Sequence, residues 1–336
     1  MKAVLRVLVL FFGIAGMRTS SFAQSGWYLQ NPLPQGNTLW AVAALDSSIV
    51  LAAGEYGTIL STTDGGASWT LQSSGTTNHL RGVSFVDANT GWAVGGGGTI
   101  LSTTDGGATW TPQSSGTTVA LHGVSFVNAN TGWAVGEQGT ILKTDNGGGV
   151  WMRQQLQIPA CMGPSFLGVS FPDANNGIAV GFCFYVGIRP PPRIPIGFRT
   201  HDGGATWVYT FYTVPPVFGG LLTAVSFADS QNAIAVGWYS QGPPPWPPRV
   251  GPIEMETTSG GDTWSGGAGP PGPVFDAVSY VDRNTVTIVG GLILRNGTRQ
   301  PSGTNNFLYG VSFVDANTGW AVGAGGTILH TTTGGE

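Results

Sequence analysis

A repeat about 40 residues long is the feature that most constrains how this chain can fold. Leu80–Thr118 reads LRGVSFVDANTGWAVGGGGTILSTTDGGATWTPQSSGTT, and Leu121 begins nearly the same text again. Three tryptophans, Trp69, Trp110 and Trp151, follow one another at intervals of 41 residues. Seven copies start near residues 39, 80, 121, 166, 222, 275 and 308. Repeats of this length bury their apolar faces against one another, so one repetitive architecture should cover the whole chain.

Four short antiparallel strands fit within one copy. Residues 82–86 (GVSFV) alternate large and small side chains, as a strand does when its two faces differ. The DANTG that follows is a turn sequence, and GWAVG, GTILSTT and the residues after Trp110 give three further strands. A solenoid is the alternative architecture, but antiparallel four-stranded units favour closure into a ring. We therefore predict an all-β fold, a seven-bladed β-propeller.

The two ends of the sequence indicate how this ring closes. Trp27–Gln30 resembles Trp69–Gln72, the fourth strand of the first copy, yet it precedes that copy. The last copy reaches Glu336 where its own fourth strand should follow. We expect the N-terminal strand to complete the C-terminal blade, because a closed ring leaves no unpaired strand edge. The propeller domain then covers residues 24–336.

Residues 1–23 have the pattern of a signal peptide. Lys2 and Arg6 precede an apolar run, and Ser21-Phe22-Ala23 offers small residues at the two positions that a signal peptidase reads. The alternative is a buried N-terminal strand. We expect cleavage after Ala23 and a secreted or periplasmic protein.

The charge balance excludes several classes of partner. Loss of residues 1–23 removes three of the 13 cations and none of the 17 acids, which leaves a formal charge of −7. A chain this acidic, without a basic tract, is not expected to bind nucleic acid. No later segment is apolar enough for membrane insertion, and no cofactor motif is present. We expect a monomer.

Cys161 and Cys183 are the two cysteines of the chain. Export would place them in an oxidising compartment, where a disulfide between them is one outcome and two free thiols the other. Two thiols without nearby His or carboxylate partners do not complete a tetrahedral ligand set. We therefore expect no metal site.

A tight turn joins the third and fourth strands of most copies. Thr62–Trp69, Thr103–Trp110 and Thr200–Trp207 fit the Asp-box pattern S/T-x-D-x-G-x-T/S-W. Three other copies have Asn146, Ser259 and Thr333 in place of the aspartate, and the sixth copy has no box. Aspartate accepts backbone N–H bonds in such a turn, and tryptophan buries a large apolar area. We interpret the Asp-box turns as structural, because they repeat where a single site could not. Their main residues are Asp64, Trp69, Asp105, Trp110, Asn146, Trp151, Asp202, Trp207 and Trp264.

The recurring text resembles that of the photosystem II stability/assembly factor-like proteins, a family of Asp-box propellers. Gly82–Trp110, Gly123–Trp151 and Gly310–Gly335 carry the resemblance, which extends over the whole chain after residue 23. It implies a seven-bladed propeller and a role in binding or assembly. Members in photosynthetic organisms assist the assembly of a photosystem reaction centre, and many similar bacterial proteins are secreted. Sortilin-type receptors, sialidases and some glycanases also have Asp-box blades.

A sialidase-type glycoside hydrolase is the enzymatic alternative. That chemistry needs an arginine cluster, a tyrosine nucleophile and acidic partners. Arg193-Ile194-Pro195 is similar to the arginine-isoleucine-proline motif of sialidases, but it lies in an insertion of the fourth copy and not before the first blade. Motifs for phosphate loops, nucleophile elbows and zinc peptidases do not occur. We predict no catalytic residues.

Two proline-rich insertions fall between the second and third strands of neighbouring copies, at Phe182–Phe198 and Trp238–Pro252. Polyproline segments hold a preset extended shape and can present side chains at a small ordering cost. Surface loops also tolerate insertions without any function. On the binding interpretation, the candidate contact residues are Arg189, Arg193, Trp246 and Arg249.

The residue that enters each first strand differs from copy to copy, and strand alternation places it around the central channel on the side of the two insertions. These residues are Trp40, Arg81, His122, Leu167, Thr223, Asp276 and Tyr309. The short turns between second and third strands add Tyr56 and Glu137 on that side, and the Asp-box turns should lie on the opposite one. A rim with aromatic and charged groups is typical of recognition surfaces, although exposed rims also vary without function.

Three hypotheses follow from the sequence. The first is a secreted, non-enzymatic binding and assembly scaffold that recognises a protein or an extracellular polysaccharide through the decorated face. The second is the sialidase-type hydrolase. The third is a purely structural domain that belongs to a larger polypeptide.

Overall fold

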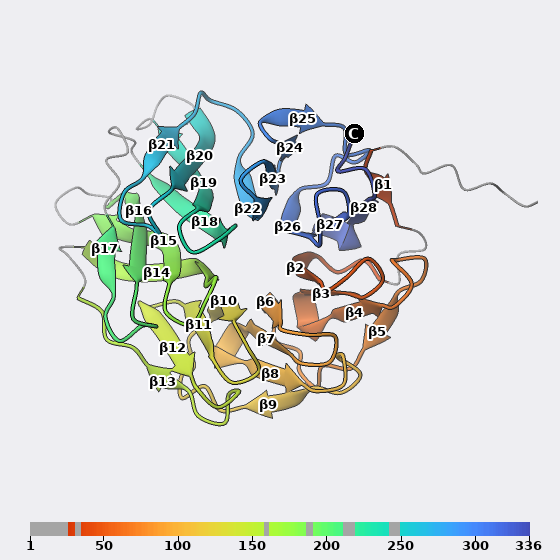
Figure 1. Cartoon of the computed structure of the whole chain (residues 1–336), viewed down its shortest axis with the longest axis horizontal. Coiled ribbons are helices and arrows are strands. Elements are labelled where there is room, and N and C mark those ends of the chain that lie inside the picture. The colour runs from red at the N-terminus through yellow and green to blue at the C-terminus, as the bar shows by residue number, and fades with distance from the viewer. Residues whose placement is uncertain (1–25, 31–34, 158–160, 186–190, 211–218, 242–248) are drawn as a thin grey trace, which may run out of the picture.

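Seven four-stranded antiparallel sheets surround a central axis in the computed structural model (Figure 1). The structure describes residues 26–30, 35–157, 161–185, 191–210, 219–241 and 249–336. The predicted signal peptide therefore lies outside the described residues. Each sheet is one blade, and its first strand lies nearest the axis. The predicted all-β, seven-bladed propeller is confirmed.

The first three blades follow the repeat closely. Their strands are β2 (Leu39–Ala44), β3 (Val50–Gly54), β4 (Ile59–Thr62) and β5 (Thr70–Gln72); β6 (Leu80–Phe85), β7 (Gly91–Gly95), β8 (Ile100–Thr103) and β9 (Thr111–Gln113); and β10 (Leu121–Phe126), β11 (Gly132–Gly136), β12 (Thr140–Thr144) and β13 (Met152–Arg153). Single 3-10 turns, η1 (Glu55–Gly57) and η2 (Gly96–Gly98), join the second and third strands of the first two blades.

The remaining blades have the same order with strands of different length. They contain β14 (Cys161–Ser170), β15 (Gly177–Tyr185), β16 (Arg193–Thr200) and β17 (Val208–Thr210); β18 (Gly220–Phe227), β19 (Ala233–Gln241), β20 (Arg249–Thr257) and β21 (Ser265–Ala268); β22 (Phe275–Asp282), β23 (Thr285–Gly290), β24 (Ile293–Arg295) and β25 (Thr298–Gln300); and β26 (Leu308–Phe313), β27 (Gly319–Gly323) and β28 (Ile328–Thr331), with η3 (Ala324–Gly326) before β28.

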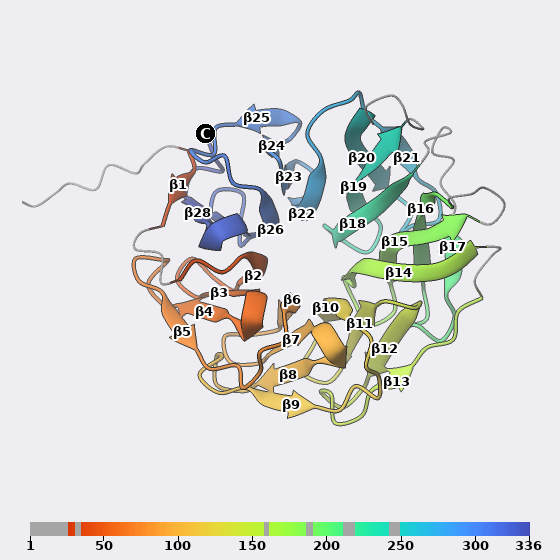
Figure 2. The ribbon, with the colours of Figure 1, turned by 180° about the vertical axis from the view of Figure 1, so that it is seen from behind.

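The last blade is completed by the N-terminal strand, as predicted. β1 (Tyr28–Leu29) pairs antiparallel with β28, with Tyr28 opposite His330. Figure 2 shows β1 beside β28 from behind, at the outer edge of the last blade. Just before β1, Trp27 packs edge-on against Phe313, with ring centroids 5.7 Å apart. It thereby occupies the place that Trp151 has in the third blade, where the corresponding distance to Phe126 is 5.8 Å.

The described flanks of the two predicted insertions are paired strand, whereas residues 186–190 and 242–248, which hold much of their proline, lie outside the described residues. β15 and β16 pair as far as Phe184 and Arg193, and β19 and β20 pair as far as Gln241 and Arg249. The pairing extends this far because side chains of the insertion enter the core: Cys183 and Ile196 are fully buried. β14 and β18 also begin before the predicted starts of their copies, at Cys161 and Gly220.

A disulfide joins Cys161 of β14 to Cys183 of β15, with a Cα–Cα distance of 5.9 Å. The sequence left this pairing open. The bond ties the extended ends of two neighbouring strands together, next to the core cluster of the fourth blade.

Aromatic stacking holds neighbouring blades together. Trp92 in the second strand of one blade stacks on Phe126 of the next blade at 3.4 Å, and Trp133 stacks on Phe171 at 3.5 Å. Each phenylalanine also meets the Asp-box tryptophan of its own blade edge-on. Burial of such large aromatic areas is the main favourable term in folding a chain of short strands.

A serine in the first strand of six blades accepts a hydrogen bond from the backbone of the next blade. Ser84 Oγ, for example, accepts the backbone N–H of Phe126 at 3.1 Å. The first blade has Ala43 at this position, and its contact with the second blade lacks the bond because the side chain has no hydroxyl. The donor and acceptor pairs are Phe126–Ser84, Phe171–Ser125, Phe227–Ser170, Tyr280–Ser226, Phe313–Ser279 and Ala44–Ser312.

Backbone hydrogen bonds define two faces of the ring. The N–H of Glu55, between the second and third strands, bonds to Thr38 O just before the first strand. The N–H of Gly65, in an Asp-box turn, bonds to Ser48 O between the first and second strands. We call the first side the mouth face and the second side the box face, and the assignment agrees with strand alternation. Within the described ranges, no helix has the length and apolar character to cross a membrane.

Candidate functional site

A β-bulge in every first strand turns one side chain toward the central axis. The pairing register shifts between Leu39 and Ala41, between Leu80 and Gly82, and at the same place in the other five blades. A bulge re-aims the extra residue and bends the strand, which is why bulges often occur beside functional sites. The bulged residues are Trp40, Arg81, His122, Leu167, Thr223, Asp276 and Tyr309.

The residues that flank each bulge explain its repetition. The preceding residue, such as Leu39 or Leu80, is fully buried and anchors the strand in the core. The following residue is Gly or Ala because the next blade comes very close. A Cβ on Gly82 would lie 2.9 Å from His122 O, and one on Gly310 would lie 3.0 Å from Trp40 O. Small residues therefore let seven strands approach the axis together.

The seven bulged residues line one cavity of about 150 Å³ at the centre of the mouth face. The structure thus brings together all seven ring residues predicted from the sequence. The cavity has two charged sides. Arg81 belongs to the second blade and Asp276 to the sixth, which is as far apart as a ring of seven blades allows.

Aromatic rings gather on the side of Arg81. Its guanidinium carbon lies 4.7 Å from the centre of the Trp40 ring, a cation–π distance. His79 packs edge-on to Trp40 at 5.1 Å and accepts the backbone N–H of Tyr56 at 3.2 Å. Tyr56 is 65% exposed, so this group presents a large aromatic surface to a partner. Sequence reasoning missed His79, whose only signal was its place one residue before a first strand.

Tyr56 has a backbone conformation that favours glycine. Its φ is 53°, and the equivalent residues of η2 and η3, Gly97 and Gly325, have φ of 64° and 62°. Gln138 in the third blade has φ of 54° at the same position. The left-handed conformation costs a non-glycine residue roughly 1 kcal/mol. Two blades therefore carry a side chain where the repeat itself favours none.

His122 is a neutral member of the ring. Burial lowers its pKa to about 4, and repulsion by Arg81 acts in the same direction. Glu137 lies 3.8 Å from His122 Nε2 and is half-exposed. Because the imidazole is neutral at pH 7, this contact is not an ion pair at that pH.

Asp276 is the partly buried acid of the ring. Burial raises the pKa of its carboxyl to about 7. Burial also raises the pKa of Tyr309 in the next blade, and the charge of Asp276 adds to that effect. On the other side, Thr223 Oγ1 donates to the carbonyl groups of Val236 and Phe275, at 3.1 and 3.2 Å.

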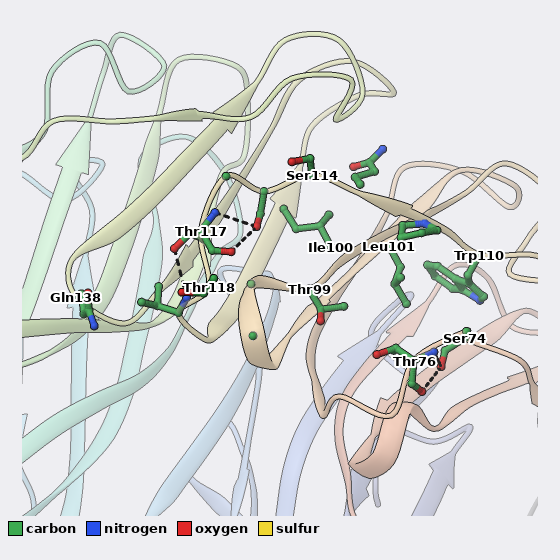
Figure 3. A pocket seen from close by; sticks show the side chains of 18 residues that line it. Ser74, Thr76, Thr99, Ile100, Leu101, Trp110, Ser114, Thr117, Thr118 and Gln138 are labelled. Carbon is green, nitrogen blue, oxygen red and sulfur yellow. Dashed lines mark hydrogen bonds between the residues drawn. The ribbon is translucent and has the colours of Figure 1, made fainter.

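A second concave region, a groove of about 820 Å³, lies over the outer strands β8 and β9 of the second blade, between the linkers that precede and follow that blade (Figure 3). Its lining includes residues of two copies of the SSGTT text that follows the fourth strand, together with Ile100, Leu101, Trp110 and Gln138. Figure 3 shows Ser114, Thr117 and Thr118 on one side, with Thr76 and Trp110 further along. Ser115 Oγ bonds to Thr117 O at 3.1 Å, so part of this polarity holds the loop itself. The groove was not predicted.

The Asp-box turns have the geometry of structural turns. Asp105 Oδ1 accepts the N–H of Thr109 at 2.9 Å and Oδ2 accepts its hydroxyl at 2.6 Å. The bonds to Thr109 and the bond from Thr103 hold the pKa of Asp105 at about 2. Asp64 and Asp202 make the same contacts in their turns. Asn146 stands in place of the aspartate in its turn, and its Oδ1 likewise accepts a backbone N–H. All belong to the box face, away from the ring.

The two insertion residues that the structure describes, Arg193 and Arg249, do not line the cavity. Arg193 lies over Phe182, 4.7 Å from its ring centre, and Arg249 is exposed at the start of β20. Arg189 and Trp246 lie outside the described residues. Other arginines have partners in separate blades, such as Asp262 for Arg199 and Thr287 for Arg295. Among the described residues, no group of three or more His, Cys, Asp or Glu side chains is placed to hold a metal ion.

The fold defines the class of protein, a seven-bladed β-propeller with a lined channel mouth. Comparison with family models gives the particular resemblance: residues 20–112 and 71–157 match the photosynthesis system II assembly factor YCF48. The resemblance to photosystem II assembly factor-like propellers, predicted from the sequence, is confirmed. A comparison with curated proteins gave no match.

Solved structures agree on the fold. YCF48 from Cyanidioschyzon merolae has 20% sequence identity and a TM-score of 0.67, with 91% of this chain and 99% of that chain covered. A structure described as YCF48 bound to D1 peptide has 17% identity and a TM-score of 0.65, with coverage of 92% and 98%. The WD40 β-propeller domain of Doa1 has 11% identity and a TM-score of 0.60, with coverage of 91% and 97%.

Proposed function

We propose that this protein is an exported, non-enzymatic assembly factor that binds a segment of a partner protein at the channel mouth. The observation that carries the proposal is the ring of seven bulged residues. Their flanking residues repeat from blade to blade, whereas the bulged side chains are aromatic, basic, acidic, hydroxyl-bearing and aliphatic. Variation confined to one surface of a repeat protein is typical of a recognition surface.

The similarity to assembly factor propellers supports a protein partner. One solved structure of this fold is described as bound to a D1 peptide, so that propeller binds a peptide. The exposed Tyr56 and the Arg81–Trp40 pair give this chain the aromatic and arginine groups that dominate protein interfaces. The extended hairpins β15–β16 and β19–β20 belong to the mouth face as well, and we include them in the proposed contact surface.

Export is part of the proposal. It rests on the signal peptide pattern of residues 1–23, and the disulfide between Cys161 and Cys183 supports it because oxidising compartments favour such bonds. Mass spectrometry of the protein recovered from its native host should give Gln24 as the first residue. Recovery of a chain that still begins at Met1 would argue against export.

The binding site is tested with a matched pair of arginine variants. Peptides selected from a random display library on the wild-type protein are labelled, and their affinities are measured by fluorescence anisotropy. We expect Arg81→Ala to weaken binding about tenfold, which is about 1.4 kcal/mol. Arg283→Ala is the control, because Arg283 lies on the box face and its contact with Asp229 is exposed.

Three outcomes would contradict the proposal. Equal loss in both arginine variants would remove the ring as the site. Selection of glycans in place of peptides on an equivalent array would favour a polysaccharide partner. Turnover of fluorogenic sialosides that Arg193→Ala abolishes would favour the hydrolase, although Arg193 packs on Phe182 and not at the ring.

A further inference from the structure

We infer that the part of the channel mouth formed by Asp276, Tyr309 and Thr223 binds a lysine side chain of the partner. The inference rests on the proposed function and names the chemistry of the partner group. The three residues come from the sixth, seventh and fifth blades, so they are neighbours in the ring.

Asp276 is a partly buried acid without a partner of its own. Within the described part of the chain, its carboxyl has no hydrogen-bond donor or ion-pair partner, and the bulge of β22 points it at the cavity. The carboxyls of the box face, by contrast, are satisfied by nearby N–H and hydroxyl groups. A partly desolvated carboxylate that no donor compensates is disfavoured, so a cation that reaches it gains a strong interaction.

Among the residues that line the cavity, no cationic side chain is next to Asp276 in the ring. The strands packed against β22 contribute Thr223 and Tyr309 to the cavity, and neither is charged at neutral pH. The ring's own cation, Arg81, is three blades away and stacks on Trp40. His122 is neutral, because burial and Arg81 lower its pKa to about 4. Glu55 on the rim is a second acid whose charge reaches Tyr309.

The size and lining of the cavity suit one ammonium group. A volume of about 150 Å³ admits a single side chain and not a folded segment. The Tyr309 ring offers a cation–π face, and Thr223 Oγ1 keeps a lone pair while its proton is donated to carbonyl groups. Lysine fits better than arginine, because a point charge on a flexible stem can enter a narrow mouth.

The protonation state of Asp276 gives the site a pH dependence of known sign. Burial raises the carboxyl pKa to about 7, so at pH 6 most of the free protein carries the proton. A lysine ammonium must then displace that proton. Affinity should rise with pH from 6 to 8 and level off above the pKa, because the carboxylate is then already formed.

The test uses peptide libraries with a fixed central residue, either lysine, norleucine or glutamate, in otherwise random neutral sequences. Norleucine keeps the lysine stem and removes the charge. On the wild-type protein we expect lysine libraries to bind about tenfold more tightly than norleucine libraries at pH 8, with a smaller ratio at pH 6. Asp276→Asn should abolish the preference. Asp145→Asn is the control, since this exposed acid lies on the box face.

The outcomes separate this inference from the proposed function. Peptide binding that depends on Arg81 but does not distinguish lysine from norleucine would overturn the inference alone. A preference for glutamate would overturn it in favour of the Arg81 side. A lysine preference that survives Asp276→Asn would place the cation elsewhere. If no library binds, both the inference and the proposed function fail.

Discussion

At the scale of single residues, Tyr56 is where the chain departs most clearly from its own repeat. Its left-handed backbone is the conformation that Gly97 and Gly325 adopt elsewhere, and its ring is largely exposed. Packing therefore does not explain the tyrosine, and the strain is tolerated because the flanking residues hold the turn. The hydrogen bond from its N–H to His79 links the turn to the aromatic group beside the ring.

Replacement of Tyr56 by glycine should separate binding from stability. Relief of backbone strain is offset by the greater freedom of glycine in the unfolded chain, so the free energy of unfolding should change by less than about 1 kcal/mol. Partner binding should weaken, because the exposed ring is lost. Gln138→Gly is the matched control with the same backbone change. Urea titration and peptide anisotropy give the two quantities, and unchanged affinity in Tyr56→Gly would exclude this rim from the site.

At the scale of elements, the first strand of each blade is a device for placing one side chain. A buried Leu or Phe, a bulged residue and a small residue follow one another in all seven copies. The buried residue fixes the register, and the small residue admits the neighbouring blade. The middle residue is then free to vary without any effect on packing.

Gly82→Val tests the small position. Its Cβ would meet His122 O at 2.9 Å and Val94 Cγ2 at 3.1 Å, and two further methyl groups would add to the crowding. We expect a loss of about 1–3 kcal/mol in the free energy of unfolding. Gly82→Ala should cost less, since Ala41, Ala224 and Ala277 occupy this position in other blades. Chemical denaturation of the pair measures the difference, and equal stability of both variants would contradict the packing argument.

The disulfide stabilises the extended hairpin of the fourth blade. The two cysteines are 22 residues apart in the sequence, and their bond restricts the unfolded chain. Cys161→Ser combined with Cys183→Ala should lower the free energy of unfolding by about 2–4 kcal/mol. Reduction of the wild-type protein should have a similar effect and should not change the double variant. A wild-type protein whose stability is insensitive to reductant would contradict a structural role.

At the scale of the whole molecule, closure of the ring depends on the pairing of β1 with β28. His330 lies there, stacked on Trp320 at 4.3 Å and bonded to the Tyr28 hydroxyl at 2.6 Å. Its Nε2 is buried and has no hydrogen-bond partner in the described structure. Burial lowers the pKa of His330 to about 4, because a protonated ring would place an unsatisfied N–H in the interior.

A low pH should therefore destabilise the pairing of β1 with β28. The unfolded chain takes up the His330 proton near pH 6.5 and the folded chain only near pH 4, so stability falls as pH drops between these values. His330→Ser, which introduces the residue found at Ser61 and Ser102, should reduce the loss between pH 7 and pH 4.5 by about 2 kcal/mol. Urea midpoints at the two pH values measure this loss of stability in the wild type and in the variant. The lowered pKa of His122 also reduces stability at low pH, and the raised pKa of Asp276 increases it, but both effects are the same in the two proteins. An equal loss of stability in the wild type and in His330→Ser would therefore contradict the role of His330.

The sequence alone determined the architecture, because seven copies of similar text impose seven blades of one design, and the displaced Trp27–Gln30 text indicated closure. It also indicated the ring position, since variation against a fixed background is visible without coordinates. Tertiary structure decided what local pattern does not encode. It showed that the bulge turns each ring residue inward, that His79 joins Trp40 and Tyr56, and that the insertions continue as paired strands. It also showed that Asp276 is partly buried without a partner. The bulges and the paired insertions form within single blades. The contacts of His79 and the surroundings of Asp276 involve neighbouring blades, so they exist only once the ring has closed.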